Sequence, residues 1–208
     1  LGDRIRMTSH YADPHVFVRS MATRGSQGGL TIKTQEVGEV FDAAGFNIII
    51  YETVGVGQIE LDIIQAADTV IVVLVPESGD EVQMLKAGLM EIGNIFSINK
   101  SDRPGANKLM VALANILSTI SIDEGKWMPQ IVQTVATEGR GTDELVNSIE
   151  FHNSFNQKFG IHKQKIDEQY ICRITELIKD DYAEKFWDDK NRSELQRELD
   201  KKHKERIS

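Results

Sequence analysis

The chain has 208 residues, of which 40% are hydrophobic and 27% charged, the composition of an ordinary globular protein of one or two domains. A net charge of −8 disfavours nucleic acid or an anionic membrane as a partner, and no apolar run approaches the roughly 18 residues that a transmembrane helix needs. The single cysteine, Cys172, excludes an internal disulfide and a thiolate metal cluster, which fits a cytoplasmic protein, and the first residues show no signal-peptide pattern.

Four short runs of β-branched and other apolar residues are predicted to be strands covered on both faces. They are residues 47–51, 69–75, 94–99 and 130–135. Patterns typical of helices lie around and between them, at residues 34–44, 79–92, 105–120 and 142–148. Strands that alternate with helices imply right-handed crossovers, so we expect an α/β fold with a mostly parallel sheet flanked by helices.

The composition changes after residue 150, which divides the expected domain 1–150 from a helical extension, 151–208. Residues 163–206 are rich in Lys, Glu and Asp and carry apolar side chains at helical spacing: Ile166, Tyr170, Ile174, Leu177 and Ile178. This pattern predicts one or two amphipathic helices. They either pack on their own domain or form an arm for dimerisation or for a partner.

Residues with a chemical role in an open parallel sheet lie where strands end, because ligands bind at the carboxyl ends of the strands. Glu52 follows the first predicted strand and is followed in turn by Gly55 and Gly57. In P-loop proteins an acid at this position holds Mg²⁺, directly or through water, and a glycine amide approaches the γ-phosphate. A loop acid beside turn glycines would give the same pattern.

The third predicted strand ends in Asn99-Lys100-Ser101-Asp102, which matches the guanine-reading motif N-K-x-D. The aspartate accepts two N–H groups of guanine, a bidentate match that adenine does not offer. After the fourth strand, residues 135–137 (Val135, Ala136, Thr137) are candidates to present a backbone amide to the guanine oxygen. Gly139 and Gly141 also fit a plain turn into the next helix. The three signals occur in the order that a guanine-nucleotide-binding α/β domain needs.

Several longer strings resemble the MeaB/ArgK family of P-loop GTPases, which are chaperones of methylmalonyl-CoA mutase. The string E-T-V-G-V-G-Q at 52–58 is similar to the family's second switch, L-G-D-R-I-R-M at 1–7 to its L-G-D-R-x-R-M segment, and G-D-E-V-Q-M-L-K at 79–86 to the start of a helix. The resemblance runs from residue 1 to about residue 146.

The resemblance implies a role for each matching position. Asp3 and Glu52 would act at the Mg²⁺ and water site, Gly55 would sense the γ-phosphate, and Gln83 and Lys86 would lie in a mobile switch. Asn99, Lys100 and Asp102 would read the guanine of GTP or GDP. The family's activity would be slow GTP hydrolysis that gates cobalamin loading and protects methylmalonyl-CoA mutase, or a related cobalamin-dependent mutase, with the GTPase acting as a homodimer.

One part of the family pattern is missing from these 208 residues: no G-x-x-x-x-G-K-[ST] phosphate-binding loop occurs, and in the family that loop precedes L-G-D-R. We therefore expect an N-terminally truncated chain that hydrolyses GTP poorly and is marginally stable, because a central strand would be missing from its sheet. One alternative is a non-catalytic module for client binding or dimerisation. Another is a nickel metallochaperone GTPase, but the five histidines form no ligand cluster and are expected at the surface.

Overall fold

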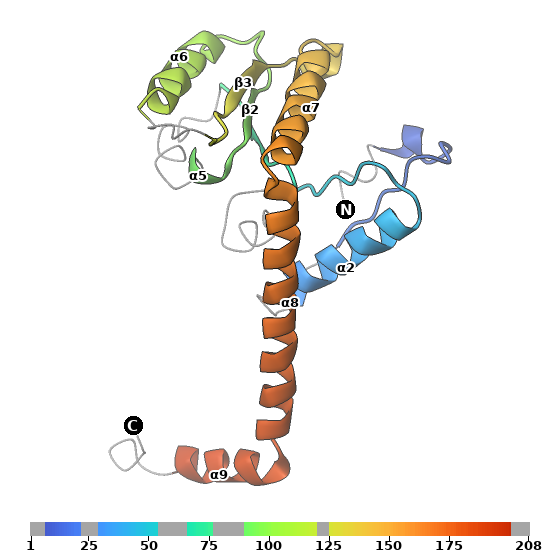
Figure 1. Cartoon of the computed structure of the whole chain (residues 1–208), viewed down its shortest axis with the longest axis vertical. Coiled ribbons are helices and arrows are strands. Elements are labelled where there is room, and N and C mark those ends of the chain that lie inside the picture. The colour runs from blue at the N-terminus through green and yellow to red at the C-terminus, as the bar shows by residue number, and fades with distance from the viewer. Residues whose placement is uncertain (1–6, 22–28, 54–65, 77–89, 120–124, 201–208) are drawn as a thin grey trace. The chain divides into compact units, whose positions relative to one another are not determined.

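The computed structural model describes residues 7–21, 29–53, 66–76, 90–119 and 125–200 (Figure 1). The chain forms two compact units, Leu1–His162 and Lys163–Ser208. The boundary expected at residue 150 falls inside helix α7, Thr142–Lys158, whose second half packs with the first unit.

The first unit is built on a parallel sheet of three strands in the order β1-β2-β3. These are β1 Ile71–Leu74, β2 Ile95–Ile98 and β3 Gln130–Gln133. Ile71 pairs with Ile95, and Ile95 pairs with Gln130. Helices lie between consecutive strands, so the predicted α/β fold and three of the four predicted strands are confirmed.

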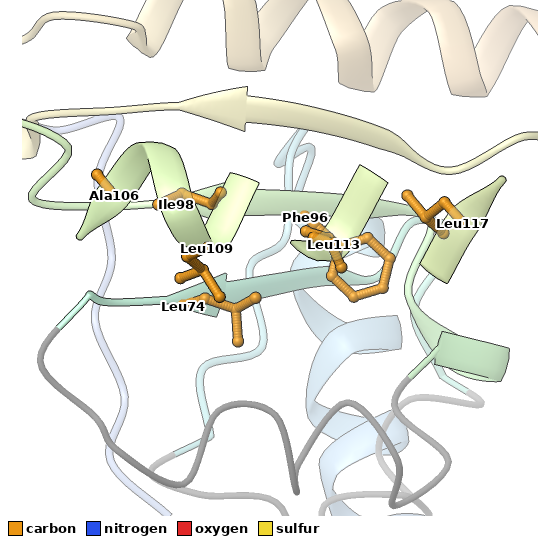
Figure 2. Close-up of a cluster of buried hydrophobic side chains, with 7 residues drawn as sticks. All are labelled: Leu74, Phe96, Ile98, Ala106, Leu109, Leu113 and Leu117. Carbon is orange, nitrogen blue, oxygen red and sulfur yellow. The ribbon is translucent and has the colours of Figure 1, made fainter. Parts of the chain in front are cut away.

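Helix α6, Ala106–Leu117, covers one face of this sheet. Its buried side chains are spaced three or four residues apart, which places them on one side of a helix. They meet alternate residues of β2 and one residue of β1 in a single cluster (Figure 2): Leu74, Phe96, Ile98, Ala106, Leu109, Leu113 and Leu117. The helix predicted at 105–120 is therefore confirmed, and β2 is buried along its whole length.

Helix α7 contacts β2 and β3, and Figure 1 shows it on the side of these strands away from α6. The predicted range, 142–148, is too short, because the inward face of this helix carries polar residues: Ser148, His152 and Asn156. Apolar periodicity cannot identify such a face.

A scattered histidine is more often a surface residue, but His152 is buried and only 3% exposed. Its Nδ1 lies 2.8 Å from the hydroxyl of Thr69, just before β1. Its ring also packs edge-on against Trp127, which donates a hydrogen bond from Nε1 to the Asn94 carbonyl. His152 thus ties α7 to the start of β1 and to the loop before β3.

The first predicted strand, 47–51, is not a strand: its residues are extended but belong to no sheet among the described residues. Ile48 and Ile50 are 79% and 84% exposed. A strand is defined by backbone hydrogen bonds to a neighbouring strand, and a run of isoleucines is only one of the two partners. The composition of this segment suits a strand, but among the described residues no strand pairs with it.

The segment 47–53 is nevertheless attached to helix α2, Gly29–Ala43, through Tyr51. A Cβ on Gly38 would lie only 1.9 Å from the Tyr51 hydroxyl, so the missing side chain of the glycine leaves room for the phenol. Burial raises the pKa of Tyr51 above its ordinary value of 10.0, and the carboxylates of Asp68 and Glu39 raise it further. Tyr51 is therefore held in its neutral form.

Among the described residues of the first unit, three further helices are short: η1 Thr8–His10, α5 Met90–Ile92 and η3 Ala136–Glu138. Helix α5 coincides with the end of the helix predicted at 79–92, and the earlier part of that prediction lies outside the described residues.

The second unit consists of most of α8, Ile161–Phe186, and of α9, Asp189–Asp200, so the predicted C-terminal helices are confirmed. The apolar stripe of α8 is exposed throughout the described side chains, from Ile166 at 50% to Tyr182 at 71%. At the corner between the helices, Arg192 Nε donates to the Trp187 carbonyl at 2.7 Å. Within the described part of the chain, neither helix is apolar enough to span a bilayer.

Candidate functional site

Two loops meet at the carboxyl ends of β2 and β3, as the sequence predicted. Residues 99–102 follow β2, and residues 135–137 follow β3 after Thr134. The backbone joins the loops: the Ser101 amide donates to the Thr134 carbonyl at 3.0 Å, and the Thr134 amide donates to the Ile98 carbonyl at 2.9 Å. The candidate guanine-reading residues are therefore held together by the sheet's own ladder and its continuation.

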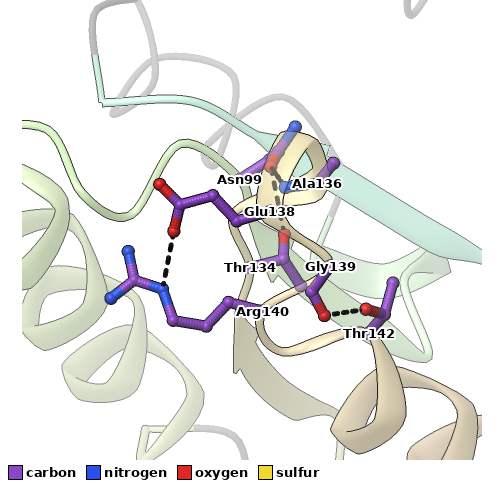
Figure 3. A network of polar contacts seen from close by, with 7 residues as sticks. All are labelled: Asn99, Thr134, Ala136, Glu138, Gly139, Arg140 and Thr142. Carbon is purple, nitrogen blue, oxygen red and sulfur yellow. Dashed lines mark hydrogen bonds and ion pairs between the residues drawn. The ribbon is translucent and has the colours of Figure 1, made fainter.

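Asn99 is the side chain that links the two loops (Figure 3). Its Oδ1 accepts a hydrogen bond from the Ala136 amide at 3.1 Å and another from the Thr134 hydroxyl at 3.3 Å. Because a backbone amide only donates, the accepting atom of Asn99 must be the oxygen. The Nδ2 group is then the end of the side chain that can donate to a ligand.

Lys100 and Asp102 form the turn that follows Asn99. Lys100 has a φ of 55°, the left-handed conformation that L side chains adopt at a cost of about 1 kcal/mol or more. Its carbonyl accepts a hydrogen bond from the Arg103 amide at 3.0 Å, which closes the turn. Asp102 is exposed, so its carboxylate is accessible to a ligand. A strained residue beside an accessible carboxylate is a common feature of binding loops.

The loop after β3 is fixed at both of its ends. Val135 is 4% exposed, and its amide donates to the Arg140 carbonyl at 2.8 Å. The Arg140 side chain reaches back to Glu138, with Nε 3.6 Å from the carboxylate, as Figure 3 shows. The Val135 carbonyl in turn accepts from the Glu138 amide at 2.9 Å, so both backbone groups of Val135 are used within the loop, whereas Ala136 and Thr137 are exposed.

Gly139 and Gly141 give this loop its turn, and their requirements differ. Both have positive φ, 69° and 78°. A Cβ on Gly141 would lie 2.1 Å from the Gln133 carbonyl oxygen, whereas a Cβ on Gly139 would come no closer than 3.7 Å to its nearest neighbour, Thr142. Gly141 is therefore required by a close backbone approach as well as by its conformation.

The chemistry of this edge suits a guanine base. An accessible carboxylate accepts from the two N–H groups that guanine presents side by side, and an amide NH₂ donates to acceptors on another edge of the base, N7 and O6. Asp102 and Asn99 supply these two groups from one turn. The Asn99 side chain is held by the Ala136 amide and the Thr134 hydroxyl, and the backbone on either side of Asp102 is held by the amide bonds of Ser101 and Arg103.

The remaining predicted site residues are only partly within the described structure. Glu52 lies in the extended segment after Tyr51 and its side chain is exposed. Asp3, Gly55, Gln83 and Lys86 lie outside the described residues. The structure therefore brings together the residues that are predicted to read the base.

Mg²⁺ fits the donor type that the described residues offer. Glu52 is an exposed carboxylate, and Mg²⁺ is usually held by one or two carboxylates together with substrate phosphates and water. Across the part of the chain that the structure describes, no three His, Cys, Asp or Glu side chains are grouped so that they could enclose a metal ion.

Sequence analysis gave no role to Ser97, and the structure places it beneath the site. Ser97 is 2% exposed and lies 3.0 Å from the hydroxyl of Thr134, which contacts Asn99. A hydroxyl inside the otherwise apolar strand I-F-S-I was the signal that could have identified it.

Comparison with known proteins was made along the whole chain. Residues 1–191 match the family model described as methylmalonyl-CoA mutase-associated GTPase MeaB. A protein of Pyrococcus horikoshii is 48% identical over 181 residues, covering 86% of this chain and 56% of its own length. The GTPase ArgK of Escherichia coli is 34% identical over 154 residues, covering 72% of this chain and 46% of its own.

Two more distant proteins extend the comparison. The mouse mitochondrial methylmalonic aciduria type A homolog is 29% identical over 189 residues, covering 89% of this chain and 46% of its own. A crystal structure of a LAO/AO transport system kinase shares the fold, with a TM-score of 0.65 at 24% identity over 82% of this chain and 56% of that one. The chain spans about half the length of the curated relatives that it matches.

Proposed function

Because this chain belongs to the family of methylmalonyl-CoA mutase-associated GTPases, MeaB, we propose that the full-length protein binds GTP with Mg²⁺, hydrolyses it, and serves a cobalamin-dependent mutase as a chaperone. The observation that carries the nucleotide part of this proposal is the junction of two loops through Asn99. It holds Asp102 and residues 135–137 at the carboxyl ends of neighbouring strands, where an α/β sheet binds its ligand.

In the proposed complex Asp102 accepts from two N–H groups of guanine, and the stem of Lys100 packs along the base. An amide of residues 135–137 faces the guanine oxygen. The Ala136 amide already donates to Asn99 and the Val135 amide to the Arg140 carbonyl, so the Thr137 amide is the better candidate for that contact. These contacts select guanine over adenine, because adenine presents a different pattern of donors and acceptors.

Hydrolysis is assigned to residues on the phosphate side. Asp3 and Glu52 would hold Mg²⁺ and its water, and Gly55 would approach the γ-phosphate with its amide. Gln83 and Lys86 would lie in the switch that responds to the client. Support comes from the family match, whose range, residues 1–191, includes all five positions. Mg²⁺ would supply positive charge at the phosphates, and phosphoryl transfer depends mainly on such positioning and charge.

The client proposed for the switch is methylmalonyl-CoA mutase or a related mutase, with GTP hydrolysis gating the loading of cobalamin and protecting the mutase. Support comes from the family description and from the name of the mouse relative. A nickel metallochaperone is less well supported, since the described residues contain no cluster of metal-binding side chains.

The proposed oligomer is a homodimer formed through α8. A stripe of apolar side chains on this helix is exposed among the described residues, and an amphipathic helix is stable when its apolar face is covered. Sedimentation of the full-length protein at micromolar concentration would give the mass of a dimer, and a monomeric mass would contradict this part of the proposal.

Nucleotide calorimetry with Mg²⁺ tests the central claim, on this chain and on the full-length protein. We expect the full-length protein to bind GDP and not ADP. Asp102→Asn should reverse the preference between guanine and xanthine diphosphates, since an amide can donate to the xanthine oxygen where the carboxylate cannot. If the full-length protein binds no guanine nucleotide, the GTPase proposal fails. The exposed α8 stripe would then favour a non-catalytic module for client binding or dimerisation.

A further inference from the structure

We infer that the buried hydroxyls of Ser97 and Thr134 are positioning groups for guanine recognition, which act through Asn99; this inference rests on the proposed nucleotide site. Ser97 and Thr134 are 2% and 4% exposed, and their oxygens lie 3.0 Å apart where β2 and β3 end. They are buried polar groups, so each needs a partner.

Counting donors fixes the direction of the hydrogen bonds. The Asn99 Oδ1 atom only accepts, so Thr134 must donate its one hydroxyl proton to it across 3.3 Å. The Thr134 oxygen is then left to accept, and the Ser97 hydroxyl must donate to it. The result is a one-way relay from Ser97 through Thr134 to Asn99.

This relay decides which end of the Asn99 amide faces the ligand. Two donors on Oδ1, from Thr134 and from the Ala136 amide, make the opposite rotamer unfavourable because it would set NH₂ against N–H. With the oxygen held in the protein, Nδ2 is presented as a donor. Guanine offers the acceptors N7 and O6 to such a donor. Ser97 therefore orients a base-reading group that it does not touch.

The expected loss of GDP affinity follows from losing one neutral hydrogen bond in the buried series Ser97–Thr134–Asn99. Ser97→Ala removes the group that donates to the Thr134 oxygen, so the Thr134 hydroxyl is less firmly held toward Asn99. Thr134→Val removes the bond to Asn99 itself. We expect GDP to bind about threefold more weakly in the first variant and about tenfold more weakly in the second. Thr134→Ser keeps the hydroxyl and should bind within about twofold of the parent.

The experiment is a double-mutant cycle with Asn99 in the full-length protein, with the Kd for GDP in Mg²⁺ measured by calorimetry. If Ser97 acts through Asn99, Ser97→Ala should weaken GDP binding in the parent and add nothing in an Asn99→Ala background. Ser148→Ala is the matched control, because Ser148 is also a buried hydroxyl and donates to the Glu144 carbonyl of its own helix. It should leave the Kd unchanged.

Each remaining outcome has one meaning. Equal weakening by Ser97→Ala in both backgrounds would show a general structural role and overturn the inference. No weakening in the parent would also overturn it while leaving the GTPase proposal intact. A parent protein that binds GDP no better than ADP would overturn both. Thermal unfolding of each variant separates loss of binding from loss of folded protein.

Discussion

Two apolar segments of similar composition have different fates in this molecule. Residues 95–98, I-F-S-I, form the central strand β2 and are fully buried, whereas the segment 47–51, N-I-I-I-Y, is extended, with Ile48 and Ile50 exposed to solvent. β2 has a strand on each side and a helix on each face. The comparison shows that burial depends on neighbours far along the chain, which composition alone does not specify.

The largest expected effect comes from truncating one side chain in each segment, which tests the comparison directly. Phe96→Ala should lower the free energy of unfolding of this chain by about 3–5 kcal/mol, because Phe96 is wholly enclosed between α6 and the sheet. Ile50→Ala should change it by less than about 0.5 kcal/mol. Urea unfolding followed by circular dichroism measures both. A loss above about 2 kcal/mol for Ile50→Ala would show that this side chain is buried in solution.

The next effect concerns how much the two glycines of the loop after β3 contribute to the free energy of unfolding. Gly141→Ala should cost about 2–4 kcal/mol, since its Cβ would collide with the Gln133 carbonyl as well as strain the backbone. Gly139→Ala shares the positive φ and has room for a Cβ, so about 1 kcal/mol is expected. The same unfolding measurement compares them. Equal losses would mean that the loop moves away from β3 without cost.

The smallest effect concerns the anchor of the exposed segment, Tyr51, and depends on pH. The raised pKa means that the folded state favours the neutral phenol, so this stability is complete below about pH 10 and is lost as the pH rises further. Tyr51→Phe has no such titration. The difference in unfolding midpoint between wild type and variant should therefore shrink between about pH 9 and pH 11.

Sequence reasoning identified the elements whose signals are local. The apolar runs of β1, β2 and β3, and the regular spacing of Leu109, Leu113 and Leu117 in α6, each reflect a single element and its own periodicity. The N-K-S-D turn was also local, because its place at a strand end follows from the strand itself. These parts of the fold and of the base-reading site could be predicted.

The parts that sequence reasoning missed depend on pairs of distant residues. Nothing in residues 47–51 reveals whether a strand lies beside them. The burial of His152 depends on Thr69 and Trp127, and the role of Ser97 depends on Thr134, 37 residues further along the chain. The inward face of α7 is polar because these partners satisfy it. The hydrophobicity of single residues does not predict such pairs.

The contacts of α7 with the start of β1 also constrain the order in which this unit folds. His152 bonds Thr69 across 83 residues, and Asn156 donates to the Asp68 carbonyl across 88 residues. Closing so long a loop is entropically costly, and contacts of this range slow folding. During synthesis, these two bonds cannot form until residue 156 has left the ribosome. Until then, the side of β2 and β3 that α7 contacts stays uncovered by this helix.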